Sequence, residues 1–264
     1  MIVTAVRQRR PLVHCITAAV TMNLVASGLL ASGARPMMTE TDAEAPVITG
    51  GASALLINLG TLSTDAMTGI PATYAANREL GLPVVLDPTA IGRAPVRTRL
   101  ARDLVRRGVT AVRCNASEVA ALAGGTGGSG PDATIPVGDV AEAARQVALT
   151  HRTVVAVSGP EDLITDGSRT LRLPGGSPLQ PLVPGTGCLL GALVAACIAV
   201  SPDDVFTATA TAHAWLAAAA EQAHPLSAGP GEFAWRLLDG LHLVTAAEVA
   251  SVMARIRPHE EETP

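Results

Sequence analysis

A short glycine-containing segment, Gly185-Thr186-Gly187-Cys188, has the composition of an anion-binding turn. It follows a loop rich in proline and glycine and opens a run of small apolar residues that predicts a buried helix. Two glycines let backbone N–H groups come close to an anion, and a helix N-terminus adds partial positive charge. The same residues would also suit the entry to a buried helix, so the motif alone leaves both interpretations open.

A second group, Asn115 and Glu118, could position magnesium. This ion prefers oxygen ligands and keeps several waters, so an amide and a carboxylate could hold it partly through water. Asp87 could join them, and Arg113 would then offer two N–H groups to phosphate oxygens. A structural interpretation is also available, because an asparagine followed three residues later by a glutamate has the spacing of a helix capping box.

Polar or glycine-bearing residues follow four predicted strands, at residues 54–58, 83–86, 110–112 and 153–158. In open α/β sheets, ligands bind outside the carboxyl ends of the parallel strands. The four strand ends therefore indicate one candidate site. They are Asn58-Leu59-Gly60, Asp87-Pro88, Arg113-Cys114-Asn115 and Ser158-Gly159.

Helical segments separate these strands. They are predicted at residues 63–80, 96–107, 115–123 and 139–150, and Gly69 and Pro71 could divide the first of them. Strands and helices that alternate at this spacing predict an α/β fold, with a mainly parallel central sheet and helices on both faces. The Asp166-Gly167 turn signal predicts an antiparallel pair nearby, and the chain is nearly all helical from Gly187 onward. No repeat or shift in composition marks a boundary, so residues 1–264 are expected to form a single domain.

The composition excludes several classes of protein. All 19 basic residues are arginine, so the chain has no P-loop lysine and no Schiff-base lysine. The net charge of −4 and an aromatic content of only 2% argue against nucleic acid or an anionic membrane as a partner. No CxxC pair or signal peptide is found, and the apolar run at residues 189–200 is too short to span a bilayer. A cytoplasmic protein is expected.

Other candidate residues have structural interpretations. His14 precedes the first predicted helix of the site region, and His213 lies in a helical region, where packing is favoured over catalysis. Cys15, Cys114 and Cys197 are interpreted as small buried hydrophobic side chains.

A series of short motifs between about residues 11 and 199 carries a further signal. These motifs are Pro11-Leu12-Val13-His14, Met22-Asn23, Gly33-Ala34-Arg35-Pro36-Met37-Met38, Asn58-Leu59-Gly60-Thr61-Leu62, Val84-Val85-Leu86-Asp87-Pro88, Arg113 with Asn115 and Glu118, Val154-Val155-Ala156-Val157-Ser158-Gly159, and Gly185-Thr186-Gly187-Cys188. Their order and spacing resemble the hydroxyethylthiazole kinase family. The cysteine is especially indicative, because the wider ribokinase-like superfamily usually has an acidic residue at that position.

The resemblance implies a ribokinase-like fold and a homotrimer with active sites between subunits. It also implies a kinase that uses Mg²⁺ and ATP to phosphorylate the hydroxyl of 4-methyl-5-(2-hydroxyethyl)thiazole in thiamine salvage. The site residues that carry over are Arg113, Asn115, Ser158, Gly185, Thr186 and Gly187 for ATP, Glu118 and Asp87 for the metal, and Met38, Gly185 and Cys188 for the thiazole. Cys188 is expected at the reacting hydroxyl, and its place at a helix N-terminus predicts a lowered pKa.

Several positions depart from the family pattern and leave the acceptor alcohol open. Ala18 stands where the family has an asparagine, Pro184 replaces a threonine, Cys114 replaces a glycine, and Thr89-Ala90-Ile91-Gly92 replaces Val-Gly-Ala-Gly. One alternative is a ribokinase-like kinase of another thiazole or a pyrimidine alcohol. Others are a lyase that repairs hydrated nicotinamide nucleotides, which would be expected to carry an acidic residue near Cys188, and a weakly active thiazole- or nucleotide-binding homologue.

Overall fold

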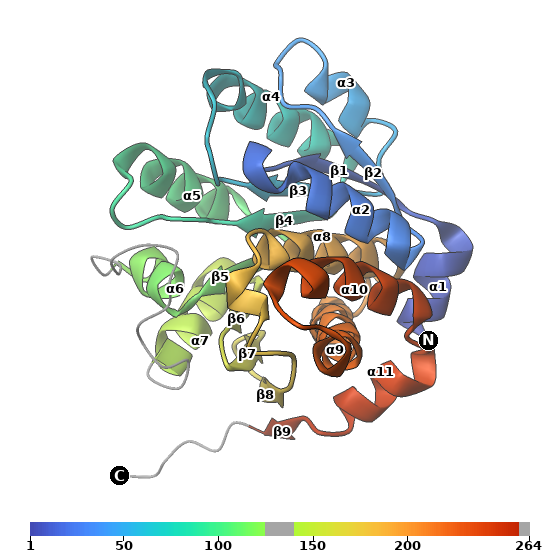
Figure 1. The fold of residues 1–264 in the computed structure, drawn as a ribbon. Coiled ribbons are helices and arrows are strands. Elements are labelled where there is room, and N and C mark those ends of the chain that lie inside the picture. The colour runs from blue at the N-terminus through green and yellow to red at the C-terminus, as the bar shows by residue number, and fades with distance from the viewer. Residues whose placement is uncertain (125–139, 259–264) are drawn as a thin grey trace, which may run out of the picture.

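The computed structural model describes residues 1–124 and 140–258, and these contain one nine-stranded sheet (Figure 1). The strand order is β2-β1-β3-β4-β5-β6-β7-β8-β9. The strands are β1 (Leu12–Ile16), β2 (Arg35–Met38), β3 (Ala54–Asn58), β4 (Val84–Asp87), β5 (Ala111–Asn115), β6 (Val154–Ser158), β7 (Glu161–Thr165), β8 (Thr170–Pro174) and β9 (Arg257–Pro258).

The sheet is mainly parallel, as the sequence predicts. Strands β1 to β6 pair in parallel, whereas β7, β8 and β9 add an antiparallel extension. The predicted hairpin at Asp166-Gly167 is confirmed, since Thr165 pairs with Thr170 across that turn. A parallel connection requires a crossover, and helices supply the crossovers here.

Helices cover both faces of the sheet (Figure 1). One face carries α1 (Ile2–Arg9), α2 (Met22–Ser32), α8 (Thr186–Val200), α9 (Val205–Ala223), α10 (Pro230–Leu243) and α11 (Ala246–Met253). The other carries α4 (Thr64–Leu80), α5 (Pro95–Arg107), α6 (Ala116–Leu122) and α7 (Ala141–His151). Short connecting elements are η1 (Ala19–Thr21), α3 (Ala45–Thr49), η3 (Gln180–Leu182) and η4 (His224–Leu226).

Each central strand contributes to two hydrophobic cores. In β3, Ala54 and Leu56 belong to the core beneath α8, whereas Leu55 and Ile57 belong to the core beneath α4. Alternate side chains of a strand point to opposite faces, so a strand covered on both faces is apolar throughout. This burial fixes the register that brings the strand ends level with one another.

Helix α8 is the central helix of the fold. It packs on β3 and β4, with α9 alongside it, and its residues Leu189–Ile198 are buried without interruption. A helix that is apolar all round belongs inside a protein or a membrane, and here the sheet and α9 enclose it. No helix in the described part of the chain has the length and apolar character needed to span a membrane.

Helix α4 is continuous, so Gly69 and Pro71 do not divide it. Ser63 caps its start by accepting a hydrogen bond from the N–H of Ala66. Gly69 is needed for close packing, because a Cβ there would collide with the carbonyl oxygen of Glu40. The predicted helix at residues 139–150 corresponds to α7, and its first predicted residue lies outside the described part of the chain.

We expect Gly69→Ala to lower the free energy of unfolding by about 1–3 kcal/mol, because the new methyl group must displace backbone. The matched control is Gly231→Ala in the first turn of α10, where a Cβ would meet no atom within 4 Å. That variant should keep or slightly raise stability. Urea unfolding of both proteins measures the difference, and equal stabilities would contradict the close approach of α4 to Glu40.

Candidate active site

The four strand ends singled out in the sequence do meet at one edge of the sheet. Asn58 at the end of β3 pairs with Asp87 at the end of β4, and Asn115 at the end of β5 pairs with Ser158 at the end of β6. Parallel pairing in this register brings side chains that are far apart in the chain into one cluster.

Arg113 lies at the centre of this cluster. Its Nη1 donates to Oδ2 of Asp87 at 3.2 Å, and its Nη2 donates to Oγ of Ser158 at 2.5 Å. Only 13% of the Arg113 side chain is exposed, and the Asp87 side chain is fully buried. Burial by itself lowers the pKa of Arg113, but the carboxylates of Asp87 and Glu118 outweigh that effect and raise it. The guanidinium is therefore a permanent, oriented positive charge.

The carboxylate of Glu118 is held by two backbone N–H groups. Ala90 donates to Oε1 at 2.9 Å and Asn115 donates to Oε2 at 2.9 Å. Asn115 in turn accepts from the N–H of Glu118, so the predicted capping box at the start of α6 is confirmed. Burial, followed by repulsion from Asp87, raises the pKa of Glu118 to about 7. Two buried carboxylates thus repel one another at the edge of the sheet.

This donor set fits a magnesium ion held jointly with phosphate. Asp87 and Glu118 supply the oxygen ligands that Mg²⁺ prefers, and a divalent cation would relieve the repulsion that raises the Glu118 pKa. Among residues 1–124 and 140–258, no three or more His, Cys, Asp and Glu side chains are grouped to hold a metal. One or two carboxylates, completed by phosphates and water, are the usual arrangement for Mg²⁺.

The N-terminus of α8 adjoins Arg113. Gly185 has φ +99°, which places it in the left-handed region that favours glycine. A Cβ on Gly187 would lie 2.5 Å from Nη1 of Arg113, so the guanidinium packs directly against the first turn of the helix. Thr186 turns its hydroxyl away, donating to the carbonyl oxygens of Gln180 and Val183. The helix start and the arginine therefore lie together, in an arrangement that suits an anion.

The prediction that the Cys188 pKa is lowered is wrong. Burial, followed by the Asp87 carboxylate, raises the pKa of this half-buried thiol. Hydrogen bonding to Thr21 and Asn58, together with the charge of Arg113, opposes the shift without reversing it. The helix N-terminus predicted from the sequence is present, but burial and a neighbouring carboxylate both disfavour the thiolate.

Met38 lies apart from the charged cluster. It ends the edge strand β2, and β1 and β3 stand between it and Asp87. Ala18 is nearer the cluster, since a Cβ on Gly60 after strand β3 would lie 2.9 Å from the Ala18 methyl group. The structure thus brings together the predicted residues for phosphate and metal, while Met38 stands at the margin.

One residue of the site region, Asp162, escaped the sequence analysis. Asp162 accepts hydrogen bonds from the N–H of Gly159 at 3.0 Å and from Nδ1 of His213, whose distance to the carboxylate is 2.6 Å. The packing interpretation of His213 is incomplete, because this side chain has a specific polar partner beside the Ser158 strand end. The sequence offers only one signal for a role of Asp162 at this turn, namely its position three residues after Gly159. His14 agrees with its structural interpretation, since it is buried and hydrogen-bonded to the carbonyl oxygen of Thr39.

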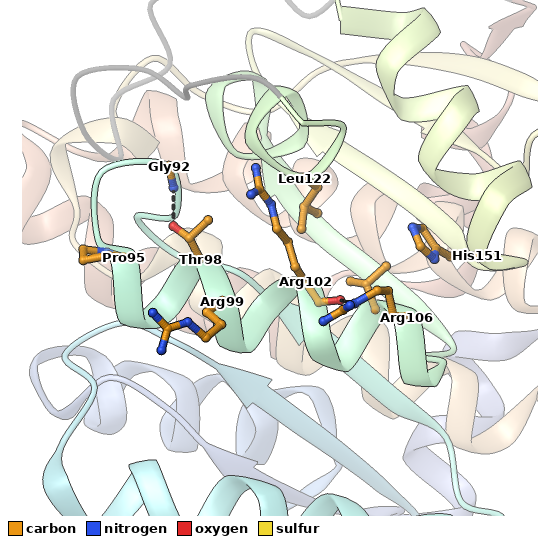
Figure 2. Close-up of a pocket in the computed structure, with 9 residues that line it drawn as sticks. Gly92, Pro95, Thr98, Arg99, Arg102, Arg106, Leu122 and His151 are labelled. Atoms are coloured by element: carbon orange, nitrogen blue, oxygen red, sulfur yellow. Dashed lines mark hydrogen bonds between the residues drawn. The ribbon is translucent and has the colours of Figure 1, made fainter.

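A surface pocket of about 620 Å³ lies elsewhere, along α5 (Figure 2). Arg99, Arg102, Arg106 and His151 line it, but in Figure 2 the arginine side chains point in different directions. Arg102 donates to the carbonyl oxygen of Ala121 near the end of α6, and Arg106 and His151 lie in the last turns of their helices. Cations at helix C-termini interact favourably with the helix dipole. The basic side chains along this pocket are therefore interpreted as structural, and no ligand is assigned to it.

Comparison with known sequences gives a consistent result. The pattern of the Hydroxyethylthiazole kinase family matches residues 3–247. A hydroxyethylthiazole kinase of Rhizobium etli (strain CIAT 652) is 47% identical over 238 residues, which cover 90% of this chain and 92% of that protein. One of Corynebacterium glutamicum (strain R) is 44% identical over 254 residues, covering 95% of each chain.

Solved structures give the same family. The hydroxyethylthiazole kinase of Pyrococcus horikoshii OT3 superposes with a TM-score of 0.87 at 33% identity and covers 98% of both chains. An ADP complex of Bacillus subtilis pyridoxal kinase, at 20% identity and a TM-score of 0.63, covers 80% of this chain and 92% of that one. The second likeness shows the ribokinase-like fold alone. With the family pattern over most of its length and relatives well above 40% identity, the chain belongs to the hydroxyethylthiazole kinase family.

Proposed function

We propose that this protein uses ATP to phosphorylate the hydroxyl of 4-methyl-5-(2-hydroxyethyl)thiazole, a step of thiamine salvage in the cytoplasm. The observation that carries the proposal is the position of Arg113, which joins Asp87 and Ser158 and packs on Gly187 at the start of α8. This arrangement supplies a phosphate site without lysine. The names of the relatives supply the acceptor alcohol.

The residues divide into three roles. The phosphates are bound and oriented by Arg113, Ser158 and the backbone of Gly185–Cys188. Asn115, at the end of β5, completes this side of the phosphate site. Asp87 and Glu118 would hold Mg²⁺, which when bound neutralises charge on the phosphates and orients them. Met38, Gly185 and Cys188 contact the thiazole, with Cys188 at its hydroxyl.

We propose in addition that residues 1–264 act as one domain.

The transfer is a direct displacement. A lone pair of the acceptor hydroxyl forms the new oxygen–phosphorus bond, and the bond from the γ-phosphorus to the bridging oxygen breaks with its electron pair leaving on ADP. The transition state is loose, so the hydroxyl keeps its proton until late. With the Cys188 pKa raised, the thiol is not the principal base; the proton passes to an oxygen of the transferred phosphoryl group.

Ala18 favours one alternative acceptor. Its methyl group, buried at 3% exposure, offers no hydrogen bond on the side of Gly60. A different thiazole or a pyrimidine alcohol with fewer polar groups would fit equally well against the apolar surface at Ala18. Incubating the protein with Mg·ATP and each alcohol, followed by mass spectrometry of the products, decides the acceptor. No phosphorylated thiazole under saturating conditions would contradict the proposal.

We infer further that the protein is a homotrimer with sites between subunits. Among the described residues, no strand pairs with the outer side of edge strand β2, and exposed apolar side chains lie on it and on neighbouring elements: Met37 on β2, Leu30 on α2 and Val20 on η1. Unpaired edges and apolar patches favour association. A partner seated there would come next to Met38 and complete the acceptor side.

Glu118→Gln and Arg113→Ala should each lower turnover by at least about tenfold, because each removes charge that positions the phosphates. The matched controls are Glu142→Gln and Arg145→Ala, which alter an exposed ion pair on α7 and should leave turnover unchanged. Steady-state kinetics on folded protein provides the measurement. Full activity in Glu118→Gln would reduce Glu118 to its capping role.

Substitutions at the start of α8 should rank in a definite order. Cys188→Ala should lose part of the activity, and Cys188→Asp should remain active because a carboxylate can accept the proton. Gly187→Val should be worse than either, since its side chain would displace Arg113 and block the phosphates. Turnover of the three variants tests the order. Complete loss in Cys188→Ala, with covalent phosphate or substrate trapped on the wild-type thiol, would identify a nucleophile and contradict direct transfer.

Light scattering at micromolar concentration should give about three times 26.8 kDa. Met37→Glu, which places a charge on the β2 edge, should shift the mass towards the monomer and reduce turnover together. A monomer with full activity would contradict the assignment of a site shared between subunits.

A further inference from the structure

The imidazole of His213 is buried in α9 and has one hydrogen-bonding partner among the described residues. Its side chain is 0% exposed, and Nδ1 lies 2.6 Å from Oδ2 of Asp162. A carboxylate accepts hydrogen bonds, so Nδ1 carries the hydrogen and donates it. Nε2 is buried and has no hydrogen-bonding partner in the part of the chain that the structure describes. Since burying a polar group is costly unless it is hydrogen-bonded, the contact with Asp162 is the one that compensates for this histidine.

Asp162 uses its two carboxylate oxygens for two different parts of the fold. Oδ2 faces His213 on α9, and Oδ1 accepts the backbone N–H of Gly159 at 3.0 Å. Gly159 and Pro160 form the turn between β6 and β7, and both are exposed. Packing therefore holds this turn weakly, and the carboxylate ties it to a buried helix.

The turn begins at Ser158, which belongs to the charged cluster. Its Oγ accepts from Nη2 of Arg113 at 2.5 Å and donates to the carbonyl oxygen of Cys114 at 3.3 Å. Hydrogen bonds thus connect His213 through Asp162 to the backbone of Gly159, and the peptide bond from Gly159 to Ser158 joins them to the residues assigned to the nucleotide.

We propose that His213 is a positioning residue that, through Asp162, holds the β6–β7 turn in the conformation that binds nucleotide. The proposal rests on the proposed function in one respect, namely that Ser158 and Arg113 contact the nucleotide. Positioning matters here because displacement of a binding group by about 1 Å can cost orders of magnitude in rate. A bond that served stability alone would leave nucleotide affinity unchanged in the folded protein.

The test uses the full chain and measures ADP affinity by calorimetry, with ATP and alcohol kinetics beside it. His213→Leu should weaken ADP binding and raise the KM for ATP about tenfold, while the KM for the alcohol stays within about twofold. His213→Asn should restore most of the affinity, because its amide N–H can occupy the place of Nδ1–H. Asp162→Asn should resemble His213→Leu, because it sets an amide N–H against one of the two donors.

The matched control is Thr209→Val, one turn earlier on α9. Thr209 is also buried and its hydroxyl has no partner, but it contacts neither Asp162 nor the turn by any hydrogen bond in the described part of the chain. This variant should keep wild-type ADP affinity. If His213 and Asp162 act as one unit, the double variant should be no worse than the poorer single one.

A folded His213→Leu protein with wild-type ADP affinity would overturn the proposal. If that variant does not fold, Asp162→Asn decides in the same way, and unchanged ADP affinity there would also overturn it. Wild-type protein that binds ADP without phosphorylating the thiazole would contradict the acceptor assignment alone, because nucleotide affinity remains the readout. Wild-type protein that fails to bind ADP would contradict both proposals.

Discussion

A buried arginine at the carboxyl edge of the sheet is the constraint on which the other features of the site depend. Arg113 is compensated by Asp87, but Asp87 and Glu118 together carry more negative charge than one guanidinium neutralises. Removing either partner of a buried ion pair leaves an uncompensated charge, which typically costs about 3–5 kcal/mol. The surrounding fold therefore has to keep all three side chains in place. Two helices, α6 and α8, do so from opposite faces of the sheet.

The absence of lysine from the chain explains why the guanidinium of Arg113 is held in one orientation. A flexible ammonium on a long stem can follow a phosphate, whereas a guanidinium gains most when its planar fork is already oriented. Asp87 and Ser158 fix that orientation, and Gly187 lets the fork lie against the start of α8. In the proposed function, the helix N-terminus and the arginine act on the same anion. As a consequence, the start of α8 cannot accommodate a side chain at Gly187.

The sequence predicted those parts of the site that depend on local pattern. Apolar runs that end in polar residues placed Asn58, Asp87, Asn115 and Ser158 at strand ends, and strand pairing made them neighbours. The capping box was likewise visible in the spacing. Contacts between distant segments were not visible, because nothing local links His213 to Asp162. The continuity of α4 through Pro71 was missed for the same reason, since packing overrides the local preference to break a helix.

Cys188 illustrates how tertiary surroundings can reverse a local expectation. A helix N-terminus favours a thiolate, but burial of the Cys188 side chain disfavours it, and so does the buried carboxylate of Asp87 at the end of β4, whose charge is poorly screened there. The thiol therefore stays protonated, and in the reaction proposed above it would lie beside the acceptor hydroxyl. That state is compatible with phosphoryl transfer, because a loose transition state develops little charge on the attacking oxygen before the new bond forms. Asp87, which acts together with burial to keep the cysteine neutral, also orients Arg113, so in the proposed reaction the site has a fixed electrostatic frame and no strong base at Cys188.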